Sequence, residues 1–117
     1  MDITAEIPIF KKTYATYKLL YNYRLDIPRL DRYAVWEKCE NLLLNILEDI
    51  LRAGQTPKSG KLPILEHASV QLNLLRVFLR LAKDVKALDM KKYIAIEAHL
   101  DEIGRMLGGW IKSLNGR

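Results

Sequence analysis

Ile103-Gly104-Arg105-Met106-Leu107-Gly108-Gly109-Trp110-Ile111-Lys112-Ser113-Leu114 is the stretch of this sequence that decides the fold. It contains three glycines, yet apolar residues continue through it at spacings of three and four, which is the signature of one helix face. These residues are Tyr93, Ile96, Leu100, Ile103, Leu107, Trp110 and Leu114. Because each glycine costs a helix about 1 kcal/mol relative to alanine, we expect close helix packing at Gly104 and Gly108 to offset that cost. The alternative is a helix that stops at Gly108-Gly109 and leaves a short tail.

Two further helices are expected in the first half of the chain. The first covers residues 8–26, because Pro8 suits the first turn of a helix, where its missing N–H is harmless. The second covers residues 31–54, with Asp31 as its N-cap and Gly54 as its C-cap. Its apolar residues form a wide helical stripe, and no strand pattern competes with it.

The second half of the chain predicts two more helices. A polar loop with Pro and Gly over residues 55–61 leads into a helix over 63–87, which Pro63 opens. The last helix covers residues 89–114, with Asp89 as its N-cap. Because the connections are short, consecutive helices should be antiparallel neighbours.

These four segments predict an all-α protein, an antiparallel up-down four-helix bundle that forms a single domain over residues 1–117. Apolar side chains occupy well over half of the circumference of the helix at 63–87. A helix of a four-helix bundle normally buries a narrower stripe against its own core. We therefore expect this helix to pack against other copies of the chain in a homo-oligomer.

A basic ridge runs along the polar side of the same helix. Arg76, Arg80 and Lys83 recur at i, i+4 and i+7. The ridge could be a solvated face, a set of cations suited to a helix C-terminus, a protein contact or a track for phosphates. Nineteen Lys+Arg against fourteen Asp+Glu give the chain a net charge of +5, which suits an anionic partner such as nucleic acid.

An aromatic row marks the first helix. Its members, spaced by four, three and four, are Phe10, Tyr14, Tyr17 and Tyr21. Such a row could stack nucleobases, as in proteins that bind single strands. Because helical spacing alone accounts for it, we expect the row to be a seam of the core, with the tyrosine hydroxyls at its edge.

Little in the sequence favours an enzyme. His67 and His99 have no Cys or Ser partner in the sequence, Glu40 is a single carboxylate, and Cys39 is the one cysteine. The Glu-x-x-His motifs of a di-metal bundle are absent, as are glycine-rich phosphate loops. We expect no catalytic residue, metal, cofactor or small-molecule substrate, and a metalloenzyme bundle is the catalytic alternative. Since no run approaches the ~20 apolar residues of a membrane span and none resembles a signal peptide, we expect a cytoplasmic protein without membrane contact.

Several distinctive segments carry a resemblance to a known family over nearly the whole chain, from about Ile7 to Leu114. They are Pro8-Ile9-Phe10 with Tyr14 and Tyr17, Glu40-Asn41-Leu42-Leu43, Ile50-Leu51-Arg52-Ala53, Lys61-Leu62-Pro63-Ile64-Leu65, residues 74–84, Lys91-Lys92-Tyr93 and residues 102–112. The last segment is the most specific. The chain resembles the accessory variability determinant (Avd) proteins of diversity-generating retroelements, which are relatives of the four-helix proteins encoded in ribosomal RNA intervening sequences.

The resemblance implies a basic four-helix bundle that assembles into a ring, a pentameric barrel in the family. It also implies association with the reverse transcriptase of the element and binding of its template RNA or cDNA in support of mutagenic cDNA synthesis. The residues expected to contact the RNA or the reverse transcriptase are Arg76, Arg80, Lys83, Arg105 and Lys112. The alternative is an oligomeric helical module that makes protein contacts and binds no nucleic acid.

Overall fold

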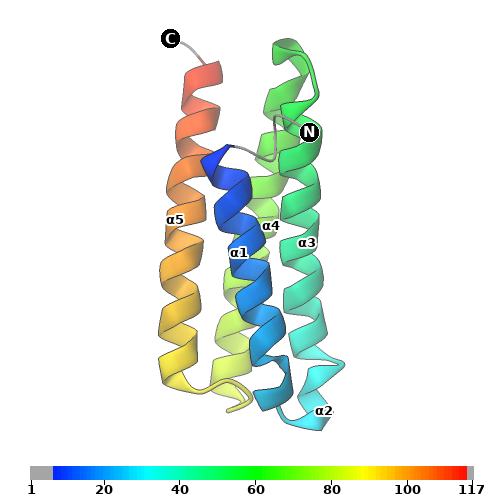
Figure 1. The fold of residues 1–117 in the computed structure, drawn as a ribbon, viewed down its shortest axis with the longest axis vertical. Coiled ribbons are helices and arrows are strands. Elements are labelled where there is room, and N and C mark those ends of the chain that lie inside the picture. Colours follow the sequence, from blue (N-terminus) through cyan, green and yellow to red (C-terminus); the bar gives the residue numbers. More distant parts are fainter. Residues whose placement is uncertain (1–6, 116–117) are drawn as a thin grey trace.

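The computed structural model describes residues 7–115, and these fold into four long helices and two short helical turns. The helices are α1 (Pro8–Tyr23), η2 (Arg24–Asp26), α2 (Arg29–Arg32), α3 (Val35–Gly54), α4 (Lys58–Asp84) and α5 (Met90–Leu114). The long helices pack antiparallel into a bundle that measures 44 × 27 × 20 Å (Figure 1). The predicted all-α, antiparallel four-helix architecture is confirmed, while residues 1–6 and 116–117 of the predicted domain lie outside the described residues.

The last helix runs without a break through its glycines, as the periodicity predicts (Figure 1). It also begins where predicted, because the Asp89 side chain accepts a hydrogen bond from the backbone N–H of Lys92 at 2.8 Å. This hydrogen bond lowers the pKa of the Asp89 carboxyl. The alternative of a helix that stops at Gly108-Gly109 is therefore wrong.

The predicted start of α4 is wrong. The helix begins at Lys58, so the connection to α3 shrinks to Gln55–Pro57, and Pro63 lies inside the helix. Pro57, with extended backbone, is the N-cap and marks the real boundary. Pro63 removes one backbone hydrogen bond close to the helix start, which the helix tolerates because of its length.

Two predicted caps are also wrong. Asp31 lies within the short helix α2, and α3 begins at Val35 with Ala34 as an N-cap that forms no side-chain hydrogen bond. Gly54 is the last residue of α3, and the C-cap is Gln55. An apolar row alone could not show the extra turn of α2, because its residues also fit the start of a longer helix.

The turn between α4 and α5 closes earlier than predicted. The helix ends at Asp84 instead of residue 87, and Lys86 adopts a left-handed conformation with φ 66°. This conformation turns the chain so that the N–H groups of Ala87 and Leu88 both donate to the Ala82 carbonyl oxygen.

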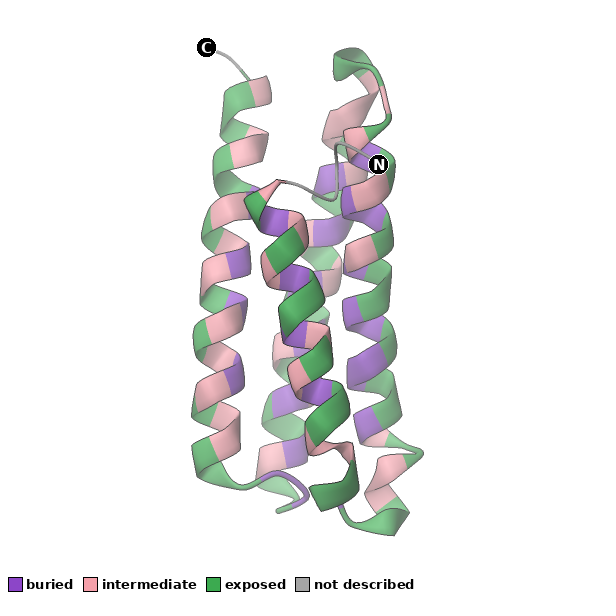
Figure 2. Ribbon diagram, viewed as in Figure 1, coloured by how far each residue is buried: buried purple, intermediate pink, exposed green. Residues whose placement is uncertain are grey.

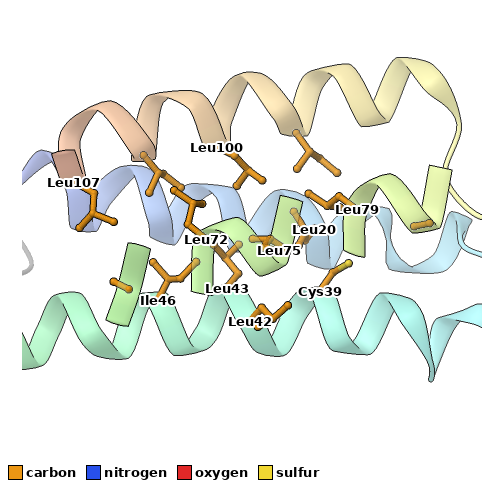
Figure 3. Close-up of a cluster of buried hydrophobic side chains, with 14 of the residues drawn as sticks. Leu20, Cys39, Leu42, Leu43, Ile46, Leu72, Leu75, Leu79, Leu100 and Leu107 are labelled. Carbon is orange, nitrogen blue, oxygen red and sulfur yellow. The ribbon is translucent and has the colours of Figure 1, made fainter. Parts of the chain in front are cut away.

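One continuous hydrophobic core fills the bundle (Figures 2 and 3). α5 contributes the predicted row Ile96, Leu100, Ile103 and Leu107, with Tyr93, Trp110 and Leu114 partly buried around it. Trp36 of α3 is fully buried, and its indole N–H donates to the Leu20 carbonyl oxygen at 3.3 Å. α4 buries Leu65, Ala68, Leu72, Leu75, Leu79 and Ala82 on one side only.

The aromatic row of α1 is a core seam only in part. Phe10 and Tyr17 are partly buried and pack against the core, as predicted, whereas the other two members do not. Tyr14 is 51% exposed and Tyr21 is 57% exposed. The buried side of α1 is instead formed by Ile9, Thr13, Thr16 and Leu20. The two threonine hydroxyls donate to backbone carbonyls one turn earlier, so they can be buried without an unsatisfied polar group.

Gly104 lies close to α4, whereas Gly108 does not contact another helix within the described residues. A Cβ atom added at Gly104 would lie 3.4 Å from Arg76 Nη2 and 3.5 Å from Leu72 Cδ2, and one added at Gly108 would have no atom within 4 Å. Close packing inside one chain therefore explains Gly104 only. The close packing expected at Gly108 would require a helix of a second molecule.

We predict opposite effects of alanine and leucine at Gly104. Alanine makes ordinary contacts there and improves helix propensity, so Gly104→Ala should raise the free energy of unfolding by about 0.5–1 kcal/mol. Gly104→Leu should lower it by about 1–3 kcal/mol, because the added carbons overpack the space beside Leu72. Urea denaturation of both variants checks this, with Gly108→Ala as the control in open space. A Gly104→Leu protein as stable as Gly104→Ala would show that the packing there is loose.

Candidate nucleic-acid interface

Arg76, the first residue of the predicted ridge, ties α4 to α5. Its Nη1 donates to Glu97 Oε1 at 3.0 Å and to Asp101 Oδ1 at 2.9 Å. Its Nη2 donates to the Leu100 carbonyl oxygen at 3.3 Å. The Arg76 side chain is 31% exposed, and its charge is balanced by these two carboxylates. The residue is therefore held in a structural contact that a phosphate would have to displace.

Arg80 lies about one turn and Lys83 about two turns further along α4. Arg80 is exposed and forms no hydrogen bond or ion pair with the described residues. Lys83 is partly buried, lies 3.4 Å from Asp84 Oδ1 and places its ammonium group 5.0 Å from the centre of the Tyr93 ring. Of the ridge, Arg80 is thus the residue whose donors remain open to an anion.

Arg105 and Lys112 extend the positive charge along α5. Helical spacing places both on the face of Asp101, which meets Arg76, so they continue the line of the ridge toward the other end of the bundle. Arg105 pairs with Glu102 one turn earlier. Lys112 is exposed and has no ion-pair partner in the part of the chain that the structure describes. Lys83 lies at the level of Tyr93, which is nineteen residues before Lys112, so this row of cations is roughly 28 Å long.

The structure adds three cations that the ridge did not include. Lys86, Lys91 and Arg29 are exposed where the α4–α5 turn approaches α2, and none has an ion-pair partner among the described residues. Pro28 and Lys86 line the same shallow pocket there. Lys83 lines this pocket as well, so the pocket adjoins the ridge.

An exposed apolar stripe runs beside the ridge on the outer side of α4. Its five members, spaced by four, three, four and four, are Val70, Leu74, Val77, Leu81 and Val85, and each is between 39% and 56% exposed. Val77 lines a pocket together with Arg76 and Arg80, so the stripe and the ridge share an edge. A contiguous apolar stripe of this length, bordered by charge, is typical of a protein interface.

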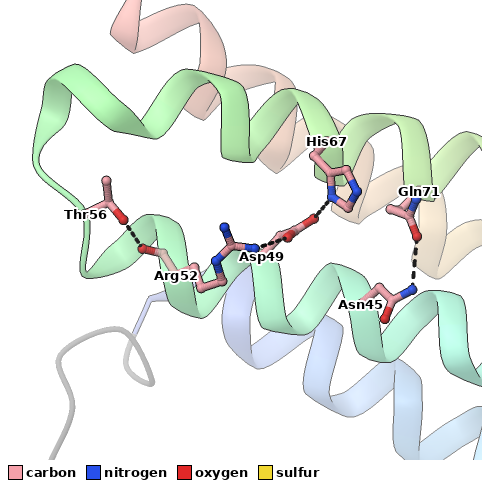
Figure 4. A network of polar contacts seen from close by, with 6 residues as sticks. All are labelled: Asn45, Asp49, Arg52, Thr56, His67 and Gln71. Carbon is pink, nitrogen blue, oxygen red and sulfur yellow. Dashed lines mark hydrogen bonds and ion pairs between the residues drawn. The ribbon is translucent and has the colours of Figure 1, made fainter.

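A second polar cluster joins α3 to α4 near their shared turn (Figure 4). The buried Asp49 carboxylate accepts a hydrogen bond from His67 Nδ1 at 2.6 Å and lies 3.5 Å from Arg52 Nη1. One turn away on each helix, the Asn45 side-chain amide donates to Gln71 Oε1 at 3.1 Å. His67 therefore links α4 to α3. Within residues 7–115 no group of three or more His, Cys, Asp or Glu side chains is placed to hold a metal ion.

Glu40 is buried at the other end of α3. Its Oε1 lies 3.8 Å from Arg24 Nε, while its Oε2 has no hydrogen-bond partner among the described atoms. Burial raises the pKa of the Glu40 carboxyl, and the nearby Arg24 only partly opposes this. Burial, together with Glu40, also raises the pKa of Cys39, to about 12, so this thiol is inert at neutral pH.

Glu40→Gln should stabilise the protein at neutral pH. A carboxyl whose pKa is raised on folding contributes stability below its unfolded pKa, and this contribution is lost as pH rises through the folded pKa. The amide keeps the shape and removes the buried charge. The urea midpoint of the variant should therefore exceed that of the wild type at pH 7 and equal it near pH 4. A variant that is less stable at pH 7 would show that the pair with Arg24 outweighs desolvation.

A family model described as bAvd-like matches residues 8–114, a range that includes all four long helices. The chain belongs to this family, the bacterial Avd proteins of diversity-generating retroelements. The resemblance seen in the sequence is thereby confirmed. Members are non-catalytic accessory proteins, and membership implies association with the retroelement machinery.

No curated protein sequence matches the chain. Over residues 7–115, none of the helices combines the length and the apolar character that crossing a membrane requires.

Proposed function

We propose that the protein is a non-catalytic, homo-oligomeric accessory subunit that binds the reverse transcriptase of its retroelement and the template RNA or cDNA, and so supports mutagenic cDNA synthesis. The observation that carries the proposal is the basic line along α4 and α5, which consists of the ridge together with Arg105 and Lys112. Arg80 and Lys112 leave their donors open, and Lys86 and Lys91 add to the positive end of the line. Open Arg and Lys donors along about 28 Å suit a phosphate backbone.

The apolar stripe of α4 supports the oligomeric part of the proposal. In one chain it exposes five aliphatic side chains that a second copy could cover. Because the stripe borders the ridge, assembly through it brings basic lines of neighbouring copies side by side. In a ring, such as the pentameric barrel that the resemblance implies, several lines face one polymer, and modest contacts in each subunit add up to strong binding.

Removing the charge of Arg80 and removing that of Arg76 should have different effects. Arg80→Ala with Lys112→Ala should weaken RNA binding several-fold and reduce the slope of log affinity against log salt by roughly 0.7 for each phosphate that the variant no longer neutralises. Arg76→Ala should change the slope much less, because the guanidinium already pairs with Glu97 and Asp101. It should instead lower the free energy of unfolding by about 1 kcal/mol. Fluorescence anisotropy with a labelled single-stranded RNA at several salt concentrations measures the slope.

Absence of RNA binding at low salt, or binding that salt does not weaken, would contradict the nucleic-acid part. The second candidate is a helical interaction module that binds the reverse transcriptase only. It is favoured by the carboxylates that already pair with Arg76, Lys83 and Arg105. Co-purification with the reverse transcriptase, without RNA affinity of the isolated protein, would support this candidate.

A further inference from the structure

A groove with a volume of about 600 Å³ lies between α1 and α3. α1 lines it with Tyr14, Tyr17 and Tyr21 and with the polar side chains of Lys18 and Asn22, and α3 contributes two leucines. The tyrosines are close enough to act together, since the ring centres of Tyr17 and Tyr21 lie 6.5 Å apart. Nothing in the core requires Tyr14 and Tyr21 here, because both are more than half exposed.

Charge and aromatic character alternate along the open face of α1. Lys11, Tyr14, Lys18 and Tyr21 are all exposed and recur at i, i+3, i+7 and i+10. The Lys18 ammonium lies 5.4 Å from the centre of the Tyr14 ring. Neither the sixteen residues of α1 nor the described residues lining the groove include a carboxylate. The face is therefore complementary to an anionic ligand that also carries flat apolar rings.

We propose that this groove binds unpaired bases of single-stranded nucleic acid, which stack on Tyr14 and Tyr21 while Lys11 and Lys18 contact the phosphates. The two tyrosines are seven residues apart, roughly 10 Å along the helix axis, which is about three base rises of 3.4 Å. Alternating rings and cations are the means by which proteins hold single strands without reading their sequence. The site deepens the proposed function and rests on it, since the RNA or cDNA of the retroelement supplies the strand.

The position of the groove keeps it separate from the other proposed surfaces. α1 packs against α3 and α5 and lies across the bundle from α4 (Figure 1). Assembly through the stripe of α4 would therefore leave the groove open. A base-paired duplex would not fit it, because its bases are stacked on each other and present no free faces.

The test compares two oligomers of equal length and charge. One is a fluorescein-labelled oligouridine, and the other is an abasic strand that has the same phosphates without bases. Wild-type protein should bind the oligouridine more tightly than the abasic strand. Tyr14→Ala with Tyr21→Ala should lose at least about tenfold in affinity for the oligouridine and nothing for the abasic strand. Tyr14→Phe with Tyr21→Phe, which keeps both rings, should bind like the wild type.

Several results would overturn the site. If wild-type protein binds the two oligomers with equal affinity, the groove does not bind bases. If that equal affinity also falls steeply with salt, the proposed RNA binding still stands. Wild-type protein that binds neither oligomer would remove both proposals. Loss of reverse-transcriptase binding in the alanine variant, with oligouridine binding unchanged, would assign the groove to a protein partner. A fall in the assembly mass of that variant would assign it to a contact between copies.

Discussion

Val77→Glu combined with Leu81→Glu should reduce the protein from an oligomer to single chains of 13.6 kDa. In one chain these side chains are 53% and 44% exposed, so the bundle itself can accommodate the glutamates. At an interface between copies the same positions would be covered, and each substitution would bring a charge into apolar surroundings. The expected effect is large because every interface of a closed assembly would carry both changes. Size exclusion with light scattering measures the mass.

Leu30→Glu is the matched control for the stripe. Leu30 is 87% exposed on α2, which packs against α3 and is not part of the stripe, so the same change there should leave the mass unaltered. Circular dichroism should show an intact helical fold for both proteins. Wild-type protein that elutes as a clean monomer would contradict the interface, and so would a double variant that keeps the full assembly mass.

Trp36→Ala should cost about 3–5 kcal/mol in the free energy of unfolding, the range for deletion of a buried large aromatic side chain. Trp36 has no exposed surface, and its indole N–H donates to the Leu20 carbonyl oxygen. The substitution would leave a cavity where α3 meets α1 and an unpaired carbonyl beside it. Urea denaturation checks this at one protein concentration, because assembly makes the midpoint concentration-dependent.

Trp36→Phe separates the hydrogen bond from the packing. It keeps most of the buried ring area and loses the indole donor, so it should cost clearly less than Trp36→Ala. This variant remains informative if the alanine variant does not fold. A loss below about 1 kcal/mol for Trp36→Ala would mean that the site relaxes around the cavity and that this residue is not central to the core.

Periodicity predicted the helices well where one long row of side chains is buried. The row of α5 survives its glycines because the bundle buries Ile96, Leu100, Ile103 and Leu107 together. The Asp89 cap was predictable because a single short-range hydrogen bond forms it. The start of α4 was not, since a helix can tolerate Pro63 near its N-terminus and prolines at 57 and 63 offer two plausible starts.

The site was less predictable because it depends on contacts between helices. The sequence identified Arg76 by spacing, but its partners Glu97 and Asp101 lie on another helix. For the tyrosines of α1, helical spacing gives the row without its orientation. Thr13 and Thr16 are buried in their place because their hydroxyls bond to the helix itself. Helix propensity and hydrophobicity do not predict that the side of α1 with the two threonines faces the core.

The most direct test of the accessory function is cDNA synthesis by the reverse transcriptase of the same retroelement on its template RNA, with and without this protein. We expect the cDNA yield to depend on the protein, Arg80→Glu with Lys112→Glu to lower the yield, and Leu30→Glu to leave it unchanged. Equal yield in the absence of the protein, with the enzyme active on the template, would contradict the account.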